Sequence, residues 1–380
     1  MRIGFDARAL STASGRRGIG SYIRGLLTAL AREVEAGGDE LLLFSGGGSG
    51  ADGADDGLAL PGVRRVALGR PSRGITLWDQ IAWPPLLARL RVSVFHSPFY
   101  AIPRFRPPGC RLVQTVHDLT PLKLPASVSK HNARIFRLNF RLARRADRLI
   151  VPSEFTRGDV LELLACPPER ITVIPEAADV TPEEIASADA ARADVLARLD
   201  MKRAYLLHTG GHDVVKNLPG LLEAFAVLAG QGRDIELVIA GEHGPPTAPI
   251  IARAAMLGLL DRVRLPGFLP RRDLIALYRG ATAVVYPSWA EGFGLPVIEA
   301  MSCGAPVVAS SAGALAEVGG DACLYADPAD AAAIASQAAR VMDDASLAAD
   351  LSRRGRARAE RFTWRETARR TLQVYREVAG

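Results

Sequence analysis

A short segment near residue 290 constrains this chain more than any other. Its first part, Ala283-Val-Val-Tyr-Pro287, is an apolar run of the kind that forms a buried strand. Two glycines follow, and then Pro296, which suits the first position of a helix because its missing N–H costs nothing there. The segment therefore predicts a strand, a glycine loop and a helix, with Glu291 on the loop and Glu299 in the first helical turn.

This order of elements suits a ligand that carries both phosphate and hydroxyl groups. Backbone N–H groups at a helix N-terminus attract phosphate, and glycines let the backbone approach a ligand closely. Two carboxylates beside an anion would repel it unless they hold something else, and hydroxyl groups are the natural candidates. Sugar, phosphate and ribose together describe a nucleotide sugar. The alternative is that both acids are solvated or cap a helix.

Residues 291–307 resemble the E-x7-E signature of retaining glycosyltransferases with the GT-B fold, in particular glycosyltransferase family 4. A bare E-x7-E is a weak signal because Glu is common. The longer pattern E-G-F-G-L-P-x-I-E-A-M-x-C-G-x-P-V is specific, and the chain matches it throughout. The resemblance implies an α/β fold with two Rossmann-like domains, whose parallel sheets face a central cleft, and a C-terminal helix that returns to the N-terminal domain.

The order of predicted elements agrees with two such halves, because strands alternate with helices from end to end. We expect a helix over 21–34 and a final helix over 364–378. Strands are expected at 2–5, 40–44, 92–95, 112–116, 149–151 and 171–174, and again at 205–209, 235–240, 263–265, 283–286 and 306–309. The predicted domains are an acceptor-binding domain over 1–177, a nucleotide-sugar-binding domain over 178–362, and the returning helix over 363–380.

The amino-acid composition restricts the class of protein and its cellular location. At 380 residues, with 48% hydrophobic and 23% charged residues, the chain has the size and balance of a two-domain globular protein. No apolar run could span a membrane, and the start lacks the features of a signal peptide, so we expect a cytoplasmic protein. The net charge of +6 favours an anionic partner. The four scattered cysteines predict buried thiols rather than a metal or redox site.

The glycines after the first strand do not make a dinucleotide site. Gly18 and Gly20 are followed by Ile23 where a third glycine would be needed. In the family, this loop lies near the donor phosphates; the alternative is a plain turn. Asp55-Asp56 sits in a Gly- and Ser-rich loop over 45–57, without a preceding strand. We therefore expect no metal clamp there, and no metal or other cofactor beyond the nucleotide sugar.

Two further loops gain a role from the resemblance. His117 follows a strand, at the edge where parallel sheets bind ligands, and would contact the transferred sugar. Its neighbour Asp118 would make a structural contact. Lys216 would stabilise the negative charge of the departing diphosphate. Many relatives also carry an arginine five residues earlier, where this chain has Gly211, so a second cation would come from Arg16 or Arg17 or be absent.

The resemblance also assigns roles around the two acids. Glu291 would hold sugar hydroxyls, helped by backbone N–H groups, and Glu299 would hold the ribose. The catalytic residues are then His117, Lys216 and Glu291. Phe268 is also compatible with the core. The full donor-binding set is Gly18, Gly20, Gly211, Lys216, Gly267, Phe268, Glu291, Gly292, Phe293, Gly294, Leu295 and Glu299.

A basic helix is predicted between residues 130 and 148. Its cations recur at three- and four-residue steps with apolar residues between them. Such a face can bind acidic lipid headgroups, which would place the protein on the inner face of the membrane. The alternative is a solvated face. Few aromatic residues interleave with the cations, so nucleic acid is not an expected partner.

Within the family, the loops at 18–22, 117–119 and 216–218 look most like those of bacterial polysaccharide and O-antigen mannosyl- or rhamnosyltransferases. We expect GDP-mannose as donor and a saccharide or lipid-linked saccharide as acceptor, with UDP- and dTDP-sugars as the alternatives. Three other readings stay open: a glycogen-phosphorylase-like enzyme with pyridoxal phosphate, a nucleotide-sugar epimerase, and a non-catalytic nucleotide-sugar sensor.

Overall fold

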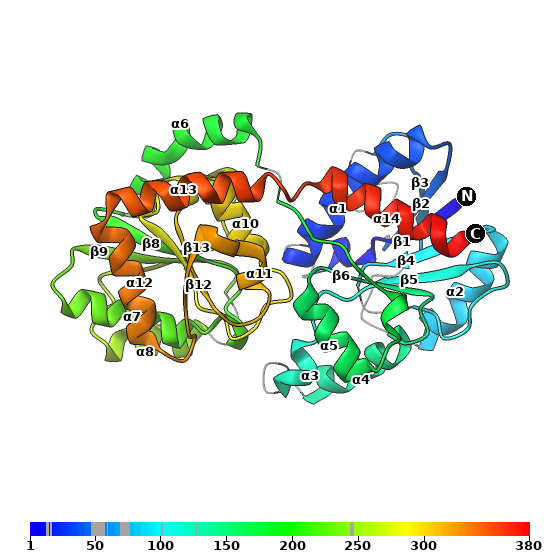
Figure 1. Cartoon of the computed structure of the whole chain (residues 1–380), viewed down its shortest axis with the longest axis horizontal. Coiled ribbons are helices and arrows are strands. Elements are labelled where there is room, and N and C mark those ends of the chain that lie inside the picture. Colours follow the sequence, from blue (N-terminus) through cyan, green and yellow to red (C-terminus); the bar gives the residue numbers. More distant parts are fainter. Residues whose placement is uncertain are drawn as a thin grey trace. The chain divides into compact units, whose positions relative to one another are not determined.

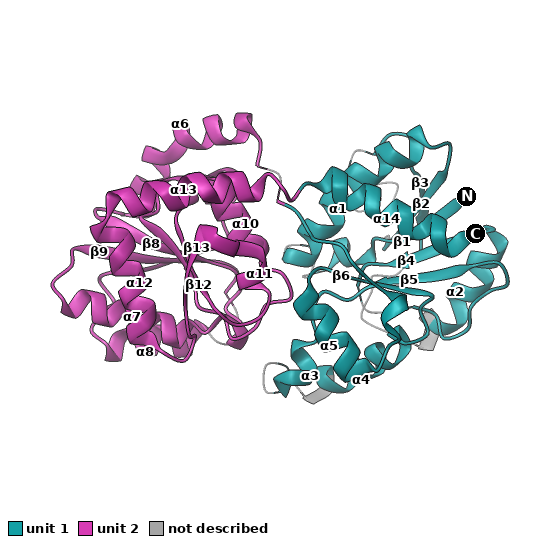
Figure 2. Cartoon of the chain, viewed as in Figure 1, with its two compact units in different colours: residues 1–177, 363–380 teal, residues 178–362 magenta. Residues whose placement is uncertain are grey.

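The computed structural model describes residues 1–12, 15, 17–46, 58, 60–68, 77–99, 102–125, 128, 130–178, 180–243 and 247–380. Within these, the chain forms two compact units (Figure 2). Unit 1 holds residues 1–177 together with 363–380, and unit 2 holds residues 178–362. Which unit binds the acceptor and which the donor stays a prediction. Arg16 and the predicted loop residues 47–57, with Asp55 and Asp56, lie outside the described residues.

Unit 1 is built on a seven-stranded parallel sheet in the order β3-β2-β1-β4-β5-β6-β7 (Figure 1). The chain runs outward from β1 in one direction and from β4 in the other, so the order reverses between these two strands. Its strands are β1 Arg2–Asp6, β2 Glu40–Ser45, β3 Arg64–Ala67, β4 Val94–Ser97, β5 Arg111–Thr115, β6 Arg148–Val151 and β7 Ile171–Val173.

Helices connect these strands and cover the sheet. The segment predicted to begin a helix at residue 21 is helical from Gly18 onward. The α-helices are α1 Gly18–Ala36, α2 Leu77–Arg89, α3 Thr120–Lys123, α4 Lys130–Ala143, α5 Glu154–Leu164 and α14 Trp364–Ala379, with short 3-10 helices at η1 Arg8–Ser11 and η4 Pro168–Arg170.

The last helix, α14, belongs to unit 1 and packs on α1. The Trp364 ring lies so close to Gly25 that a Cβ there would be 2.1 Å from it, which explains the glycine inside α1. Tyr375 reaches the sheet, where its hydroxyl bonds Nδ1 of buried His96. These contacts return the C-terminal helix to the N-terminal unit, as the resemblance to the family implied.

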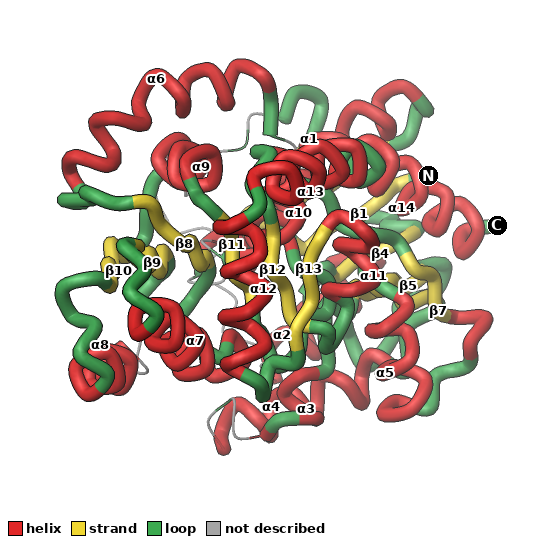
Figure 3. The backbone as a smooth tube through the Cα atoms, turned by 60° about the vertical axis from the view of Figure 1, so that its left-hand side comes forward, coloured by secondary structure: helices red, strands yellow, loops and turns green. Residues whose placement is uncertain are grey.

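Unit 2 repeats the architecture with six parallel strands in the order β10-β9-β8-β11-β12-β13 (Figure 3). The strand order reverses between β8 and β11. The strands are β8 Ala204–Thr209, β9 Ile235–Ala240, β10 Val263–Gly267, β11 Ala283–Tyr286, β12 Val307–Ser310 and β13 Cys323–Ala326.

Two hydrophobic clusters cover the two faces of this sheet. One contains side chains of α6, α9 and α10, and the other contains side chains of α7, α8 and α12. The helices are α6 Pro182–Arg198, α7 Leu218–Gly230, α8 Thr247–Met256, α9 Arg271–Gly280, α10 Leu295–Ser302, α11 Leu315–Gly319, α12 Ala331–Asp343 and α13 Ala345–Ala359, with 3-10 helices at η5 Val214–Lys216 and η6 Gly320–Ala322. Two Rossmann-like units in series confirm the predicted fold class.

Candidate active site

The loop between β11 and α10 has the predicted order of strand, glycine turn and helix. Gly294 precedes α10 at a φ of 108°, and a Cβ there would come within 2.5 Å of Leu315 Cδ2. Only glycine fits this position without strain. Pro296 is the second residue of α10, and Glu299 is the fifth. Glu299 therefore begins the second helical turn, and its expected place in the first turn was wrong by one residue, because α10 begins at Leu295.

Lys216 and Glu291 come from loops far apart in sequence and meet in unit 2. Lys216 ends the segment after β8, and Glu291 follows β11. The Lys216 Nζ donates to Glu291 Oε1 at 2.7 Å and to the Tyr286 hydroxyl at 2.8 Å. Because β8 and β11 flank the point where the strand order reverses, this pair lies at the edge where open parallel sheets bind ligands.

The pair is largely sheltered from water. Side-chain exposure is 18% for Lys216 and 14% for Glu291. Burial alone would lower the pKa of Lys216, but the Glu291 carboxylate and the Tyr286 hydroxyl outweigh it and raise that pKa. Lys216 is therefore an ammonium, and its Nζ also lies 5.0 Å from the Tyr286 ring centroid. Sequence reasoning missed Tyr286, although a tyrosine in a buried strand needs a hydrogen-bond partner.

The loop that carries Lys216 is held by backbone-directed contacts. Asn217, in the left-handed conformation, donates from Nδ2 to the carbonyl oxygens of Pro287 and Pro328. Trp289 N–H donates to Val215 O at 2.8 Å. These bonds tie the loop after β8 to the loop after β11, so the position of the ammonium is fixed by the fold rather than by the lysine alone.

The glycines of the predicted donor loop have different surroundings. Gly210 has a φ of 136°, and its carbonyl oxygen would be 1.6 Å from a Cβ at Gly241. These two glycines therefore let the loops after β8 and β9 touch. Gly211, the position of the family arginine, carries no side chain that could replace that cation. Gly267 ends β10 at a φ of 76°.

Glu299 is half-buried in a second polar group of unit 2. Its Oε2 accepts a hydrogen bond from the Tyr278 hydroxyl at 3.2 Å, and that hydroxyl also bonds Thr209 Oγ1 at 2.7 Å. Burial raises the pKa of Glu299, and the Arg271 guanidinium opposes that rise. Arg271 in turn donates to Glu184, which belongs to the capping box of α6. Tyr278 and Arg271 were not singled out from the sequence.

The aromatic residues of the predicted donor set divide between core and surface. Phe293 is 4% exposed, and its ring packs against Phe362 with centroids 5.8 Å apart. Only the backbone of Phe293 is therefore available to contact a bound ligand. Leu295 is also buried. Phe268 is 61% exposed, which excludes the alternative that it is a core residue.

His117 lies in unit 1 with both ring nitrogens engaged. Nδ1 lies 2.7 Å from Glu176 Oε1, and Nε2 lies 2.9 Å from the Pro98 carbonyl oxygen. Burial opposes protonation, but the Glu176 carboxylate and the Pro98 carbonyl raise the pKa of His117. Both partners are acceptors, so the protonated ring can donate to each of them. Its partner Glu176, 4% exposed, could not be found from the sequence because it lies 59 residues away.

The surroundings of His117 join three elements of unit 1. The ring of Tyr22 from α1 meets the His117 ring edge-on at 4.6 Å. Asp118 Oδ1 accepts from Thr120 N–H at 2.9 Å, the structural contact expected for it. Gly20 is buried in the first turn of α1, where a Cβ would lie 1.9 Å from Gly15 O. That glycine allows a close backbone approach, and Gly18 begins the same helix.

The predicted basic helix forms as α4, which ends at Ala143 rather than near residue 148. Five arginines of this segment are exposed, and Leu138 among them is 49% exposed. Arg148 lies beyond the helix and pairs with Glu377 at 3.4 Å. The exposed arginines are Arg134, Arg137, Arg141, Arg144 and Arg145.

Several buried polar atoms have no hydrogen-bond partner among the described residues. In unit 2 they include Nε2 of His208, Nε2 of His212 and Oγ of Ser288, all near the ends of β8 and β11. In unit 1 they include Oε1 of Gln114 and both side-chain polar atoms of Asn139. Buried polar groups are normally bonded, so such atoms mark places where a ligand can complete the bonding.

The described residues contain neither a group of metal ligands nor a membrane-spanning helix. No group of three or more His, Cys, Asp or Glu side chains that could hold a metal occurs in the described parts of the chain. In the same parts, no helix is both long and apolar enough to cross a membrane. All four cysteines are buried and free, as the sequence predicted.

Comparison with solved structures defines the class of protein. A sucrose-phosphate synthase from Thermosynechococcus elongatus has a TM-score of 0.76 at 22% identity, over 100% of this chain and 99% of that one. Anabaena Alr3699/HepE, solved in complex with UDP and glucose, has a TM-score of 0.72 at 19% identity, over 99% and 100%. These likenesses show the fold, which is the GT-B fold of glycosyltransferases.

Sequence comparison then gives the family. The family model described as Glycosyltransferase Family 4 matches residues 17–181, and the one described as Glycosyl transferases group 1 matches residues 196–358. The O-antigen chain mannosyltransferase B of Escherichia coli is 31% identical, over 94% of this chain and 96% of that protein. The chain therefore belongs to glycosyltransferase family 4 and is a glycosyltransferase.

Two further relatives show a spread of acceptors within this similarity. The D-inositol 3-phosphate glycosyltransferase of Salinispora tropica is 34% identical, over 72% of this chain and 60% of that protein. The MMP alpha-(1->4)-mannosyltransferase of Mycolicibacterium hassiacum is 32% identical, over 71% and 66%. Both matches cover less than the full length of either protein.

Proposed function

We propose that this chain is a retaining, metal-independent hexosyltransferase that builds a polysaccharide. It takes mannose from GDP-mannose and adds it to a saccharide or lipid-linked saccharide. The observation that carries the proposal is the meeting of Lys216 and Glu291, 2.7 Å apart, where the strand order of unit 2 reverses. A cation and a hydroxyl-binding acid at one point suit the two halves of a nucleotide sugar, its diphosphate and its hexose.

The transfer needs little covalent chemistry from the protein. The bond between the anomeric carbon and the diphosphate oxygen breaks, and the acceptor oxygen attacks on the same face. The acceptor proton passes to the departing phosphate oxygen. Lys216 stabilises the negative charge that develops on the diphosphate, where a fixed cation has its largest effect. To do so, it must loosen its bond to Glu291, which then accepts hydrogen bonds from the sugar hydroxyls.

Glu299 is the proposed ribose ligand. Its carboxylate is half-buried and accepts one hydrogen bond, from the Tyr278 hydroxyl. A carboxylate can accept further hydrogen bonds, and a ribose offers two neighbouring hydroxyl donors. Gly267 and the exposed Phe268 would border the base, together with the backbone of the glycine loop at 292–294.

The choice of mannose rests on names in the family. Two relatives of this chain, from Escherichia coli and Mycolicibacterium hassiacum, are mannosyltransferases by name. The UDP and glucose in the HepE structure keep a UDP-sugar as the first alternative, with dTDP-sugars next. O-antigen synthesis by the first relative supports a saccharide acceptor.

His117 is proposed to contact the transferred sugar, and its geometry limits how. Because both ring nitrogens are engaged, a hydrogen bond to the sugar requires His117 to give up the Pro98 carbonyl or the Glu176 carboxylate. The alternative within this proposal is contact through the ring edge. A KM for the donor that changes in His117→Gln would support either form of contact.

The exposed arginines of α4 are proposed to place the enzyme on the inner face of the membrane. Five cations on and just after one helix, with an exposed leucine among them, suit acidic headgroups at about 1 kcal/mol per cation. Sedimentation with phosphatidylglycerol vesicles should fall in Arg137→Gln/Arg141→Gln and stay unchanged in Arg353→Gln/Arg369→Gln. Equal sedimentation of both variants would contradict this placement.

The proposed reaction is tested by transfer from GDP-, UDP-, dTDP- and ADP-sugars to octyl α-D-mannopyranoside in EDTA. The expected product is an α-linked disaccharide from GDP-mannose, with the anomer read by proton NMR. A β-linked product would refute retention, and activity that requires a divalent ion would refute metal independence. Interconversion of the free donor without acceptor would point to the epimerase, and binding without turnover to the sensor.

A further inference from the structure

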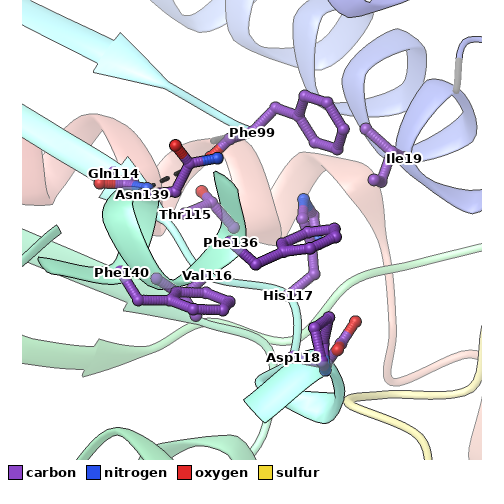
Figure 4. Close-up of a pocket in the computed structure, with 11 residues that line it drawn as sticks. Ile19, Phe99, Gln114, Thr115, Val116, His117, Asp118, Phe136, Asn139 and Phe140 are labelled. Carbon is purple, nitrogen blue, oxygen red and sulfur yellow. Dashed lines mark hydrogen bonds between the residues drawn. The ribbon is translucent and has the colours of Figure 1, made fainter. Parts of the chain in front are cut away.

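A small cavity in unit 1 lies at the carboxyl end of β5. It is lined by residues of α1, of the loop after β4, of β5 and of α4 (Figure 4). Figure 4 shows Ile19, Phe99 and Phe136 on one side of it and the amides of Gln114 and Asn139 on the other. We call this cavity the amide pocket. Its volume of about 60 Å³ corresponds to roughly four water-sized spheres, enough for part of a sugar ring.

The amides of this pocket are buried without complete bonding. Asn139 is 0% exposed, and neither Nδ2 nor Oδ1 has a hydrogen-bond partner among the described residues. Gln114 is 2% exposed; its Nε2 donates to Phe99 O at 3.3 Å, but its Oε1 accepts nothing there. The pocket therefore offers one unused donor group and two unused acceptors, side by side with aromatic walls.

The charges around the pocket exclude a phosphate as the natural ligand. The charged side chains among the described lining residues are His117 and Asp118. His117 is already paired with the Glu176 carboxylate at 2.7 Å, and Asp118 adds a negative charge. Among the described lining residues, an anion would meet the Asp118 carboxylate and no cation other than the already paired His117. A neutral ligand that both donates and accepts hydrogen bonds fits instead.

The aromatic side chains that line the pocket restrict the chemical class of its ligand further. Phe136 and Phe140 lie one turn apart on α4, with nearly parallel rings 6.2 Å apart, and both line the pocket. Apolar surface of a ligand gains by leaving water against such rings. A sugar combines apolar C–H faces with hydroxyls that donate and accept, so it satisfies both the rings and the amides.

We propose that the amide pocket is a saccharide subsite for the acceptor, with Asn139 and Gln114 as specificity-determining residues. This inference rests on the proposed function, because it names which part of unit 1 receives the acceptor sugar. It also explains why a helix otherwise packed by apolar residues keeps a fully buried asparagine.

The test measures sugar binding and stability on the same variants. The probe is methyl α-D-mannopyranoside, with the matching glucoside, galactoside and rhamnoside, followed by saturation-transfer NMR. Asn139→Leu keeps the branched shape and the number of heavy atoms and removes the amide, and should weaken mannoside binding about tenfold, the value of one to two hydrogen bonds. Its Tm should stay equal or rise, because the replacement removes unpaired polar atoms from the interior. Asn132→Leu, on the exposed side of α4, is the matched control and should bind like the wild type.

The outcomes separate this inference from the proposed reaction. GDP and UDP binding is measured in parallel by thermal shift and should be unchanged in Asn139→Leu. Mannoside binding that survives Asn139→Leu, or no signal from any of the four sugars with the wild type, overturns the subsite. If Asn139→Leu loses sugar binding and no nucleotide raises the Tm of the wild type, the subsite is supported. The proposal of a nucleotide-sugar donor is then refuted. If Asn139→Leu does not fold, Gln114→Met carries the same test.

Discussion

The Lys216–Glu291 pair allows a direct test of how the site is held before the donor binds. The two side chains are 2.7 Å apart and mostly buried. At an effective dielectric constant of about 20, their attraction is roughly 6 kcal/mol. Desolvation of both ions offsets most of this, so the pair as a whole contributes little to stability. Removal of one partner alone is different, because it leaves the other charge buried and unpaired.

The experiment is a double-mutant cycle with Lys216→Met and Glu291→Gln. Lys216→Met leaves the Glu291 carboxylate buried without its cation. It should lower the free energy of unfolding by about 3 kcal/mol, which lowers Tm by roughly 6 to 12 °C for a unit of this size. Glu291→Gln should cost about 2 kcal/mol, because the amide oxygen can still accept from Nζ. The double variant should lose about 2 kcal/mol, less than Lys216→Met alone.

Scanning calorimetry measures the Tm of each variant in the cycle, and substitution of a surface lysine is the control. Lys202→Met removes a lysine that is 73% exposed and pairs with an equally exposed Asp200, so it should leave Tm unchanged. Strictly additive losses in the cycle would mean that the two groups do not interact. That result would refute the claim that Lys216 and Glu291 form an ion pair before the donor binds.

The remaining predictions concern one residue in each unit. The raised pKa of His117 means that the native protein holds a proton that the unfolded chain releases near pH 6.5, so its stabilising effect is complete below that pH and is lost as pH rises through the higher native pKa. Glu176→Gln should flatten this part of the stability–pH curve, and an unchanged curve would exclude the ion pair. Gly294→Ala forces a Cβ to within 2.5 Å of Leu315 Cδ2 at a φ of 108° and should cost about 2 to 4 kcal/mol in urea unfolding. Gly230→Ala, with nothing within 4 Å of the added Cβ, should not destabilise; equal effects would contradict the steric argument.

Periodicity and local motifs predicted the fold because they act over short stretches of chain. The buried strands β9 and β11 form over the predicted residues 235–240 and 283–286, since apolar runs between helices leave few alternatives. The exposed edge strand β3 was not predicted, because its residues 64–67 lack an apolar face. The start of α1 was placed late, because Gly18 and Gly20 look like a loop when their contact with Gly15 is unknown.

The candidate site was predictable in its motif residues and not in their partners. The spacing of Glu291 and Glu299 can be recognised in one segment. Tyr278 bonds Glu299 across 21 residues, and Glu176 reaches His117 across 59, so both depend on tertiary packing that no short pattern carries. The sequence did not predict that Asn139 is buried, because a single polar residue on an amphipathic helix is expected on the solvent-exposed face.

The central claim is that unit 2 binds a nucleotide sugar through Glu299 and its neighbours. The most direct measurement is a thermal-shift panel in EDTA with GDP, UDP, dTDP and ADP and their common sugar conjugates, on wild type and Glu299→Ala. The account predicts stabilisation of the wild type by one nucleotide, with GDP expected, and loss of most of that shift in Glu299→Ala. Equal stabilisation of both proteins would contradict the ribose assignment, and stabilisation of neither by any nucleotide would contradict the donor site itself.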